Sequence, residues 1–170
     1  RIIDSEVFQI VLTGGEPLLY ADETIDYIGR LKQANIDVGM NSNVTLMTPE
    51  LVQKLQDTGF YGILTSLSSY DPDHHHEITQ TEDTHARLLA NIELLTSRGI
   101  NVAVNMVVSK LNIDDVYKTG MMTYNLGASA FSATRMSPVV LAGERHLDLC
   151  LDCEETKRML DNLLGVRDDT

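Results

Sequence analysis

The feature that most constrains the fold is the alternation of short apolar runs with segments of helical periodicity. Apolar runs at a regular spacing, each followed by a segment with the helical repeat, indicate βα units and a mostly parallel sheet. The predicted strands are Phe8–Thr13, Asp37–Asn41, Gly62–Leu67, Asn101–Val108 and Ala128–Ala133. The predicted helices are Asp22–Ala34, Pro49–Asp57, Asp83–Arg98, Asp114–Tyr124 and Cys153–Leu164. We therefore expect an α/β fold with about five parallel βα units.

Residues at the ends of the predicted helices support these boundaries. Thr48 and Pro49 form an N-cap followed by proline at the first helical position, and Gly59 stands where a C′ glycine ends that helix. Arg98 and Gly99 end the following helix with a cation and then a glycine. The apolar residues of that helix recur at helical spacing and should face the sheet: Leu88, Leu89, Ile92 and Leu95.

Length and composition indicate one domain spanning residues 1–170. This length suffices for one core and is short for two domains. Hydrophobic residues make up 43% and charged residues 22%, which argues against disorder. The formal charge of −12 argues against a nucleic-acid or anionic-membrane partner, because phosphate binding needs clustered Lys and Arg. A small molecule or a peptide is the expected ligand.

The sequence shows no targeting segment. No stretch approaches the roughly 20 apolar residues of a membrane span, and no signal segment opens the chain. The expected location is therefore the cytoplasm. Two cysteines provide no disulfide framework.

The motif Gly14-Gly15-Glu16-Pro17 follows the first predicted strand directly. Parallel α/β folds bind ligands at the C-terminal ends of their strands. The glycines lack Cβ atoms, so a ligand can approach the backbone closely. Pro17 should hold Glu16 extended, with its side chain aimed away from the following helix. A carboxylate fixed there suits an ammonium group, and a plain strand-to-helix turn is the alternative interpretation.

The segment from Leu12 to Leu19, Leu-Thr-Gly-Gly-Glu-Pro-Leu-Leu, resembles the second strand and its turn in the radical S-adenosylmethionine (radical SAM) enzymes. In that family the turn binds the amino group of the methionine moiety. The resemblance therefore implies cofactor-binding roles for Gly14, Gly15, Glu16 and Pro17. It extends from about Phe8 to Pro138 and implies a partial (β/α) barrel of the radical SAM type, with the first unit missing.

Two further strand ends resemble cofactor-binding turns of the family. The segment 41–46, Asn-Ser-Asn-Val-Thr-Leu, is similar to the family's Thr-Asn-Gly-Thr-Leu-Leu, with Val44 in place of glycine. Its Ser42 and Asn43 offer a hydroxyl and an amide to ribose hydroxyls or a carboxylate, and an Asx turn is the alternative. The segment 65–70 resembles the family's Ser-Leu-Asp-Gly turn, which implies that Ser66 approaches the methionine carboxylate. Serines replace the aspartate and the glycine there.

Two polar residues on the last strands are further candidates. The strand 101–108 is apolar on both faces apart from Asn105, as expected when helices cover one face and a core fills the other. Its buried amide needs partners, which a cofactor or a neighbouring strand end could supply. Arg135 and the following Met136-Ser137-Pro138 resemble the family's final strand and adenine-side loop. The guanidinium could pair with a carboxylate of cofactor or substrate, or with a loop acid.

Histidines and cysteines suggest metal chemistry only weakly. The run His74-His75-His76 lies where related enzymes often carry a histidine and an acidic residue near the substrate. Neighbouring side chains in an extended loop point in different directions, so we expect a solvated loop with one histidine facing the cavity. Cys150 and Cys153 have a spacing that suits two thiolates on one metal, but a cluster needs more ligands, so coincidence is the favoured interpretation. No metal ligand and no catalytic residue is predicted in this chain.

The family's Cys-x3-Cys-x2-Cys loop, which holds its [4Fe–4S] cluster, does not occur in this sequence. We expect a piece of a longer chain, comprising βα units two to six, with the cluster loop upstream of Arg1. The resemblance implies that the parent protein cleaves S-adenosylmethionine reductively to a 5′-deoxyadenosyl radical, which takes a hydrogen atom from a substrate. Among the members of the family, the resemblance favours relatives that modify peptides. The piece alone should be inactive.

Two other functions compete with this prediction. One is a different (β/α)-barrel enzyme, of the lyase or aldolase type, that uses Glu16 and a histidine of the 74–76 run as acid and base. The other is a non-catalytic small-molecule-binding module that keeps the pocket without the cluster.

Overall fold

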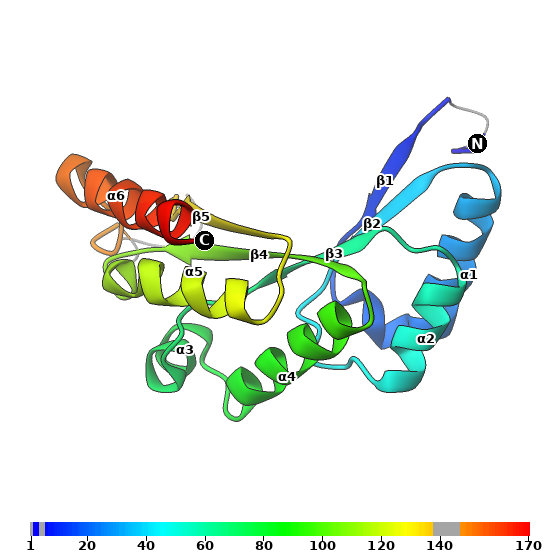
Figure 1. The fold of residues 1–170 in the computed structure, drawn as a ribbon, viewed down its shortest axis with the longest axis horizontal. Helices are drawn as coiled ribbons and strands as arrows, with labels where there is room; N and C mark the ends of the chain where they lie inside the picture. Colours follow the sequence, from blue (N-terminus) through cyan, green and yellow to red (C-terminus); the bar gives the residue numbers. More distant parts are fainter. Residues whose placement is uncertain (1, 4–5, 138–146) are drawn as a thin grey trace.

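The computed structural model describes residues 2–3, 6–137 and 147–170, and its five strands form one parallel sheet in the order β1-β2-β3-β4-β5 (Figure 1). The strands are β1 (Gln9–Leu12), β2 (Asp37–Asn41), β3 (Gly62–Ser66), β4 (Asn101–Val108) and β5 (Ala130–Arg135). The helices are α1 (Ala21–Gln33), α2 (Pro49–Asp57), α3 (Pro72–Thr79), α4 (Thr84–Ser97), α5 (Val116–Asn125) and α6 (Cys153–Asp169), with short 3₁₀ turns η1 (Pro17–Tyr20) and η2 (Ile113–Asp115). Sequential strand order with helices between strands confirms the predicted α/β class.

The predicted boundaries agree closely with the structure. β2, β4 and α2 coincide with the predicted ranges, and most other ends differ by one or two residues. The Thr48 hydroxyl accepts a hydrogen bond from the Leu51 amide, and Gly59 has a φ of +73°, as the capping residues predict. β5 begins at Ala130 instead of Ala128, because the Ala128 amide still bonds to the Thr123 carbonyl in the turn after α5.

The core lies between the sheet and the helices of one face. Figure 1 shows α4 and α5 along the same side of the sheet, with α6 beside β5. The α4 residues predicted to face the sheet do so: Leu88, Ile92 and Leu95 are buried in the core, and Leu89 is partly buried against it. No helix in the described ranges is long and apolar enough to cross a membrane.

The prediction that β4 is covered on both faces is wrong. Burial alternates along the strand: Val102 and Val104 are fully buried, whereas Val107 is 49% exposed. Helices cover one face only, so the other face of the sheet stays open in the described structure.

The prediction of a solvated loop at the histidine run is also wrong, because residues 72–79 form α3. Asp71 is its N-cap, with its carboxylate accepting from the amides of Asp73 and His74, and Pro72 occupies the first helical position. The same Asp-Pro signal stands in the sequence and explains why the helix begins there.

Candidate functional site

The C-terminal ends of β1 to β4 meet at one edge of the sheet and enclose a cavity of about 270 Å³. Its lining includes most of the predicted site residues: Gly14, Gly15, Glu16, Ser42, Asn43, Ser66 and Asn105. Pro17 lines an adjoining cavity of about 620 Å³ together with Gly15 and Glu16. The parallel topology therefore gathers residues from four separate segments of the chain.

The glycine turn leaves open space at the rim of this cavity. Gly14 has a φ of +134°, which side chains rarely allow. A Cβ added to Gly14 or Gly15 would meet no heavy atom within 4 Å. The protein itself does not fill this space, so a ligand can contact the backbone of both residues.

Glu16 is extended, with φ −93° and ψ 112°, as predicted from Pro17. Its Oε1 accepts from the Leu18 amide at 3.1 Å and from the Ser42 hydroxyl at 2.7 Å, and its Oε2 accepts from the Asn43 amide at 2.9 Å. The prediction that the side chain points away from the following helix is therefore wrong. The first amides of η1 have no partner within the turn, and the carboxylate supplies one. Oε2 accepts one bond and keeps acceptor capacity for a cation.

Ser42 and Asn43 hold the second wall of the cavity. The buried Ser42 hydroxyl donates to Glu16 and accepts from the Val44 amide at 3.0 Å. The Asn43 Oδ1 accepts from the amide and the hydroxyl of Thr45, so the Asx turn that the sequence left open is present. Both residues thus order the strand-end turn as well as lining the cavity.

Ser66 and Asn105 present polar groups that the described chain does not fully use. Within the described residues, the exposed Ser66 hydroxyl makes no hydrogen bond. The Asn105 Oδ1 accepts from the hydroxyls of Ser132 at 2.9 Å and Thr134 at 2.7 Å, so the neighbouring strand supplies its partners. Within the described residues, the Asn105 amide nitrogen donates no hydrogen bond, which leaves it available to a ligand.

Arg135 lies apart from this cavity. It is the last residue of β5, pairs in register with Val108 and is exposed. In the part of the chain that the structure describes it makes no ion pair, and its pairing with a carboxylate of cofactor or substrate, or with a loop acid, stays a prediction. Pro138 of the same predicted segment lies outside the described residues.

The histidines of α3 contact buried groups on other elements. His74 Nδ1 lies 2.8 Å from Oδ2 of Asp115, a buried carboxylate that also accepts from the Ser69 hydroxyl at 2.7 Å. This hydrogen bond and the charge of Asp115 raise the pKa of His74. Sequence reasoning missed Ser69 and Asp115, because their 46-residue separation gave no local signal.

His75 is a core histidine and is 3% exposed. The edge of one ring faces the other between His75 and His85, with the two ring centroids 5.2 Å apart. Burial lowers the pKa of His75 to about 4. It is therefore neutral near pH 7. No group of three or more potential metal ligands occurs among the described residues.

The cysteines lie at the start of α6. Asp152 caps this helix, with its carboxylate accepting from the Glu155 amide at 2.8 Å and the Glu155 carboxylate accepting from the Asp152 amide at 2.9 Å. Cys153 is the first helical residue and is exposed. The capping box accounts for the helix start without any metal.

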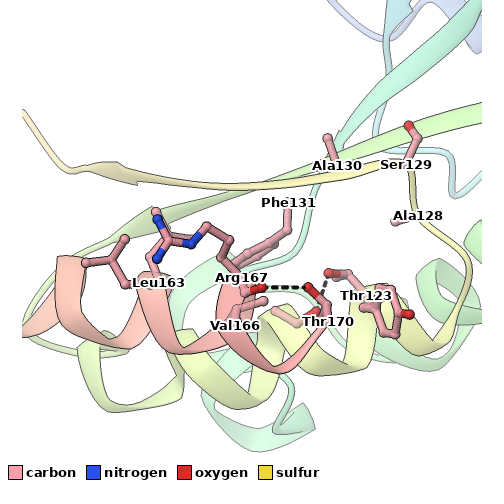
Figure 2. A pocket seen from close by; sticks show the side chains of 12 residues that line it. Thr123, Ala128, Ser129, Ala130, Phe131, Leu163, Val166, Arg167 and Thr170 are labelled. Atoms are coloured by element: carbon pink, nitrogen blue, oxygen red, sulfur yellow. Dashed lines mark hydrogen bonds between the residues drawn. The ribbon is translucent and has the colours of Figure 1, made fainter.

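A separate cavity of about 480 Å³ lies between α5, α6 and the start of β5 (Figure 2). Phe131, Leu163 and Val166 make it largely apolar. It is formed at the N-terminal end of β5, and none of the predicted site residues lines it.

The parallel strands, their sequential order and the ligand-accessible turns at their C-terminal ends define a partial (β/α) barrel. The sequence model of the radical SAM superfamily matches residues 1–120, and the chain belongs to that superfamily. Members of this superfamily bind S-adenosylmethionine and a [4Fe–4S] cluster. This membership argues against the alternative prediction, a lyase or aldolase of another barrel family.

Relatives in sequence and in structure agree with this assignment. The chain is 32% identical over 130 residues to the AdoMet-dependent heme synthase of Methanosarcina barkeri and 36% identical over 124 residues to the GTP 3',8-cyclase of a Sulfurovum species. These alignments cover 76% and 72% of this chain but 37% of each relative, so the chain spans about a third of their length. Both relatives are enzymes.

The solved structures show the same fold. Native anSMEcpe with bound AdoMet and a peptide has a TM-score of 0.79, with 16% identity over 96% of this chain and 48% of that one. SuiB of Streptococcus suis bound to S-adenosylmethionine has a TM-score of 0.75, with 16% identity over 95% and 35%. At 16% sequence identity, this similarity shows a shared fold and nothing further.

Proposed function

We propose that this chain is the S-adenosylmethionine-binding part of a radical SAM enzyme and forms βα units two to six of its core. The observation that carries the proposal is the cavity at the strand ends, in which an open glycine turn, a fixed carboxylate and unused polar groups converge. The two cysteines of the sequence cannot supply three cluster ligands. In this proposal, residues outside the 170 of this chain hold the cluster.

The chemistry of the cavity fits the amino-acid end of the cofactor. The Glu16 carboxylate, held by three donors, presents Oε2 to an ammonium group beside the Cβ-free backbone of Gly14 and Gly15. The Ser66 hydroxyl and the Asn105 amide are donors suited to a carboxylate or a hydroxyl. A binding role for Arg135, which lies outside this cavity, stays a prediction.

This chain would contribute binding and orientation to the reaction. When bound, S-adenosylmethionine and the cluster supply a 5′-deoxyadenosyl radical, which takes a hydrogen atom from the substrate. Ser42 and Asn43 keep Glu16 in place, so the cofactor meets a preformed wall instead of a mobile carboxylate. The 170-residue piece alone is proposed to be inactive.

A peptide is the substrate that we propose, supported by the peptide complex of anSMEcpe among the structural neighbours. The heme synthase and the GTP 3',8-cyclase among the relatives bear names that do not indicate peptide substrates. The proposed peptide substrate therefore depends on the fold analogy alone. The cytoplasmic location and the absence of nucleic-acid and membrane partners stay predictions from the sequence.

The test uses the full-length protein, reconstituted anaerobically with iron and sulfide. We expect cluster absorbance and formation of 5′-deoxyadenosine from S-adenosylmethionine with a reductant. Glu16→Gln should weaken cofactor binding about tenfold, because an ammonium loses a charged partner. Asp26→Asn, which removes one exposed carboxylate from α1, is the matched control and should leave the affinity unchanged.

Two results would contradict the proposal in different ways. Binding of S-adenosylmethionine without any 5′-deoxyadenosine would favour the non-catalytic binding module. An unchanged affinity in Glu16→Gln would show that the cofactor does not use this cavity.

A further inference from the structure

Val44, in the turn after β2, has an unusual backbone conformation. Its φ is +52°, in the left-handed region, although its side chain is β-branched and fully buried in the main core. This region is sterically disfavoured for such a residue, so other contacts must hold the turn in place.

Hydrogen bonds on both sides of Val44 hold the turn. Its amide donates to the Ser42 hydroxyl at 3.0 Å, and its carbonyl accepts from the Met47 amide at 3.1 Å; both partners belong to the turn itself. The same carbonyl also accepts from Nδ2 of Asn91 at 2.8 Å. Asn91 lies on α4, 47 residues further along the chain, and is buried. Its amide thus ties the strained turn to a rigid helix.

The residues next to Val44 carry the contacts that fix Glu16. The Asn43 amide donates to Oε2 of Glu16 at 2.9 Å, and the Ser42 hydroxyl donates to Oε1 at 2.7 Å. A turn that relaxes at Val44 would move both donors. The position of the carboxylate in the cavity therefore depends on the same turn that Asn91 holds.

We propose that Asn91 is a positioning residue for the cofactor cavity, acting through the left-handed turn at Val44 on the donors that orient Glu16. This inference rests on the proposed function for its effect on S-adenosylmethionine binding. The effect on the turn itself is independent of any ligand, which allows the two to be tested separately.

The experiment uses Asn91→Leu, which keeps the number and branching of the side-chain heavy atoms and removes the donor, and Asn91→Asp, which replaces the amide donor with an acceptor. In the full-length protein, both variants should weaken S-adenosylmethionine binding about fivefold, equivalent to about 1 kcal/mol, a typical net contribution of one hydrogen bond. In the Glu16→Gln background, Asn91→Leu should change the affinity by less than about twofold, because residues that act through one network are not additive.

A second measurement follows hydrogen exchange of the Asn43 amide in the cofactor-free protein. We expect exchange about tenfold faster in Asn91→Leu, as the turn opens more often. Thr123→Val is the control: it removes a buried hydroxyl that donates to the Gly120 carbonyl within α5, outside the site, and should change neither the affinity nor the exchange of Asn43.

The outcomes separate this inference from the proposed function. If the wild-type protein does not bind S-adenosylmethionine, the proposed function fails, and the exchange of Asn43 still decides the role of Asn91. Unchanged exchange in Asn91→Leu, or an equal loss of affinity with and without the Glu16 carboxylate, would overturn the positioning role.

Discussion

Two helical glycines at the α5–α6 contact should respond to alanine with opposite signs. Gly120 lies within α5, and a Cβ added there would stand 2.6 Å from Cγ2 of Val166 on α6 and 3.0 Å from Cδ1 of Phe131 on β5. Figure 2 shows Val166 and Phe131 facing the cavity beside this contact. Gly165 lies within α6, where a Cβ would meet the Tyr117 ring at 3.4 Å, an ordinary contact distance.

The magnitudes follow from two competing effects. Alanine in place of glycine inside a helix stabilises by about 0.8 to 1.0 kcal/mol. At Gly120 the added methyl also overpacks a buried contact, which costs about 1 to 3 kcal/mol because Val166 is itself buried and its backbone must shift. Gly120→Ala should therefore lower the free energy of unfolding by about 1 kcal/mol. Gly165→Ala should raise it by a little under 1 kcal/mol.

Urea unfolding followed by circular dichroism would measure both variants against the wild type. The two variants share the same chemical change and the same helix–helix contact, so their difference of about 2 kcal/mol isolates the steric term. If Gly120→Ala stabilised the protein as much as Gly165→Ala, the close approach of α5 and α6 at Gly120 would be refuted.

Further predictions concern pH and the cavity. Because burial lowers the pKa of His75 to about 4, the unfolded chain binds a proton that the folded chain does not, and stability should fall by roughly 3 kcal/mol as the pH drops from 7 to 4. His75→Leu should remove this slope in acid unfolding curves. The pKa of His74 is raised by Asp115, so the stability it contributes is present at low pH and lost as the pH rises through its folded pKa. Asp115→Asn should return the NMR titration of His74 toward pH 6.5, and an unchanged titration would contradict the pairing. Ser66→Ala should weaken S-adenosylmethionine binding about fivefold without changing unfolding, since its hydroxyl has no partner within the described chain; lower stability with unchanged affinity would argue against its role.

Local sequence signals determined most of the architecture. Apolar runs placed β2 and β4 at their observed bounds, and the Thr48-Pro49 start with Gly59 behind it placed α2. Such signals depend on neighbours within a few residues, which is why they can be read from the chain alone. The glycine motif at 14–15 and the polar strand ends at 42–43 and 66 identified one cavity, because parallel strands bring their C-terminal ends to one edge.

Tertiary structure decided how those residues are used. The Glu16 side chain turns back to cap η1 and to meet Ser42 and Asn43, contacts that span up to 27 residues and leave no periodic trace. The Asn91 amide reaches Val44, and the Asp115 carboxylate reaches Ser69, for the same reason. Burial and hydrogen-bond partners depend on which elements pack together. The sequence by itself therefore located the cavity, whereas only the packed structure determined which side chains face it and which hold those side chains in place.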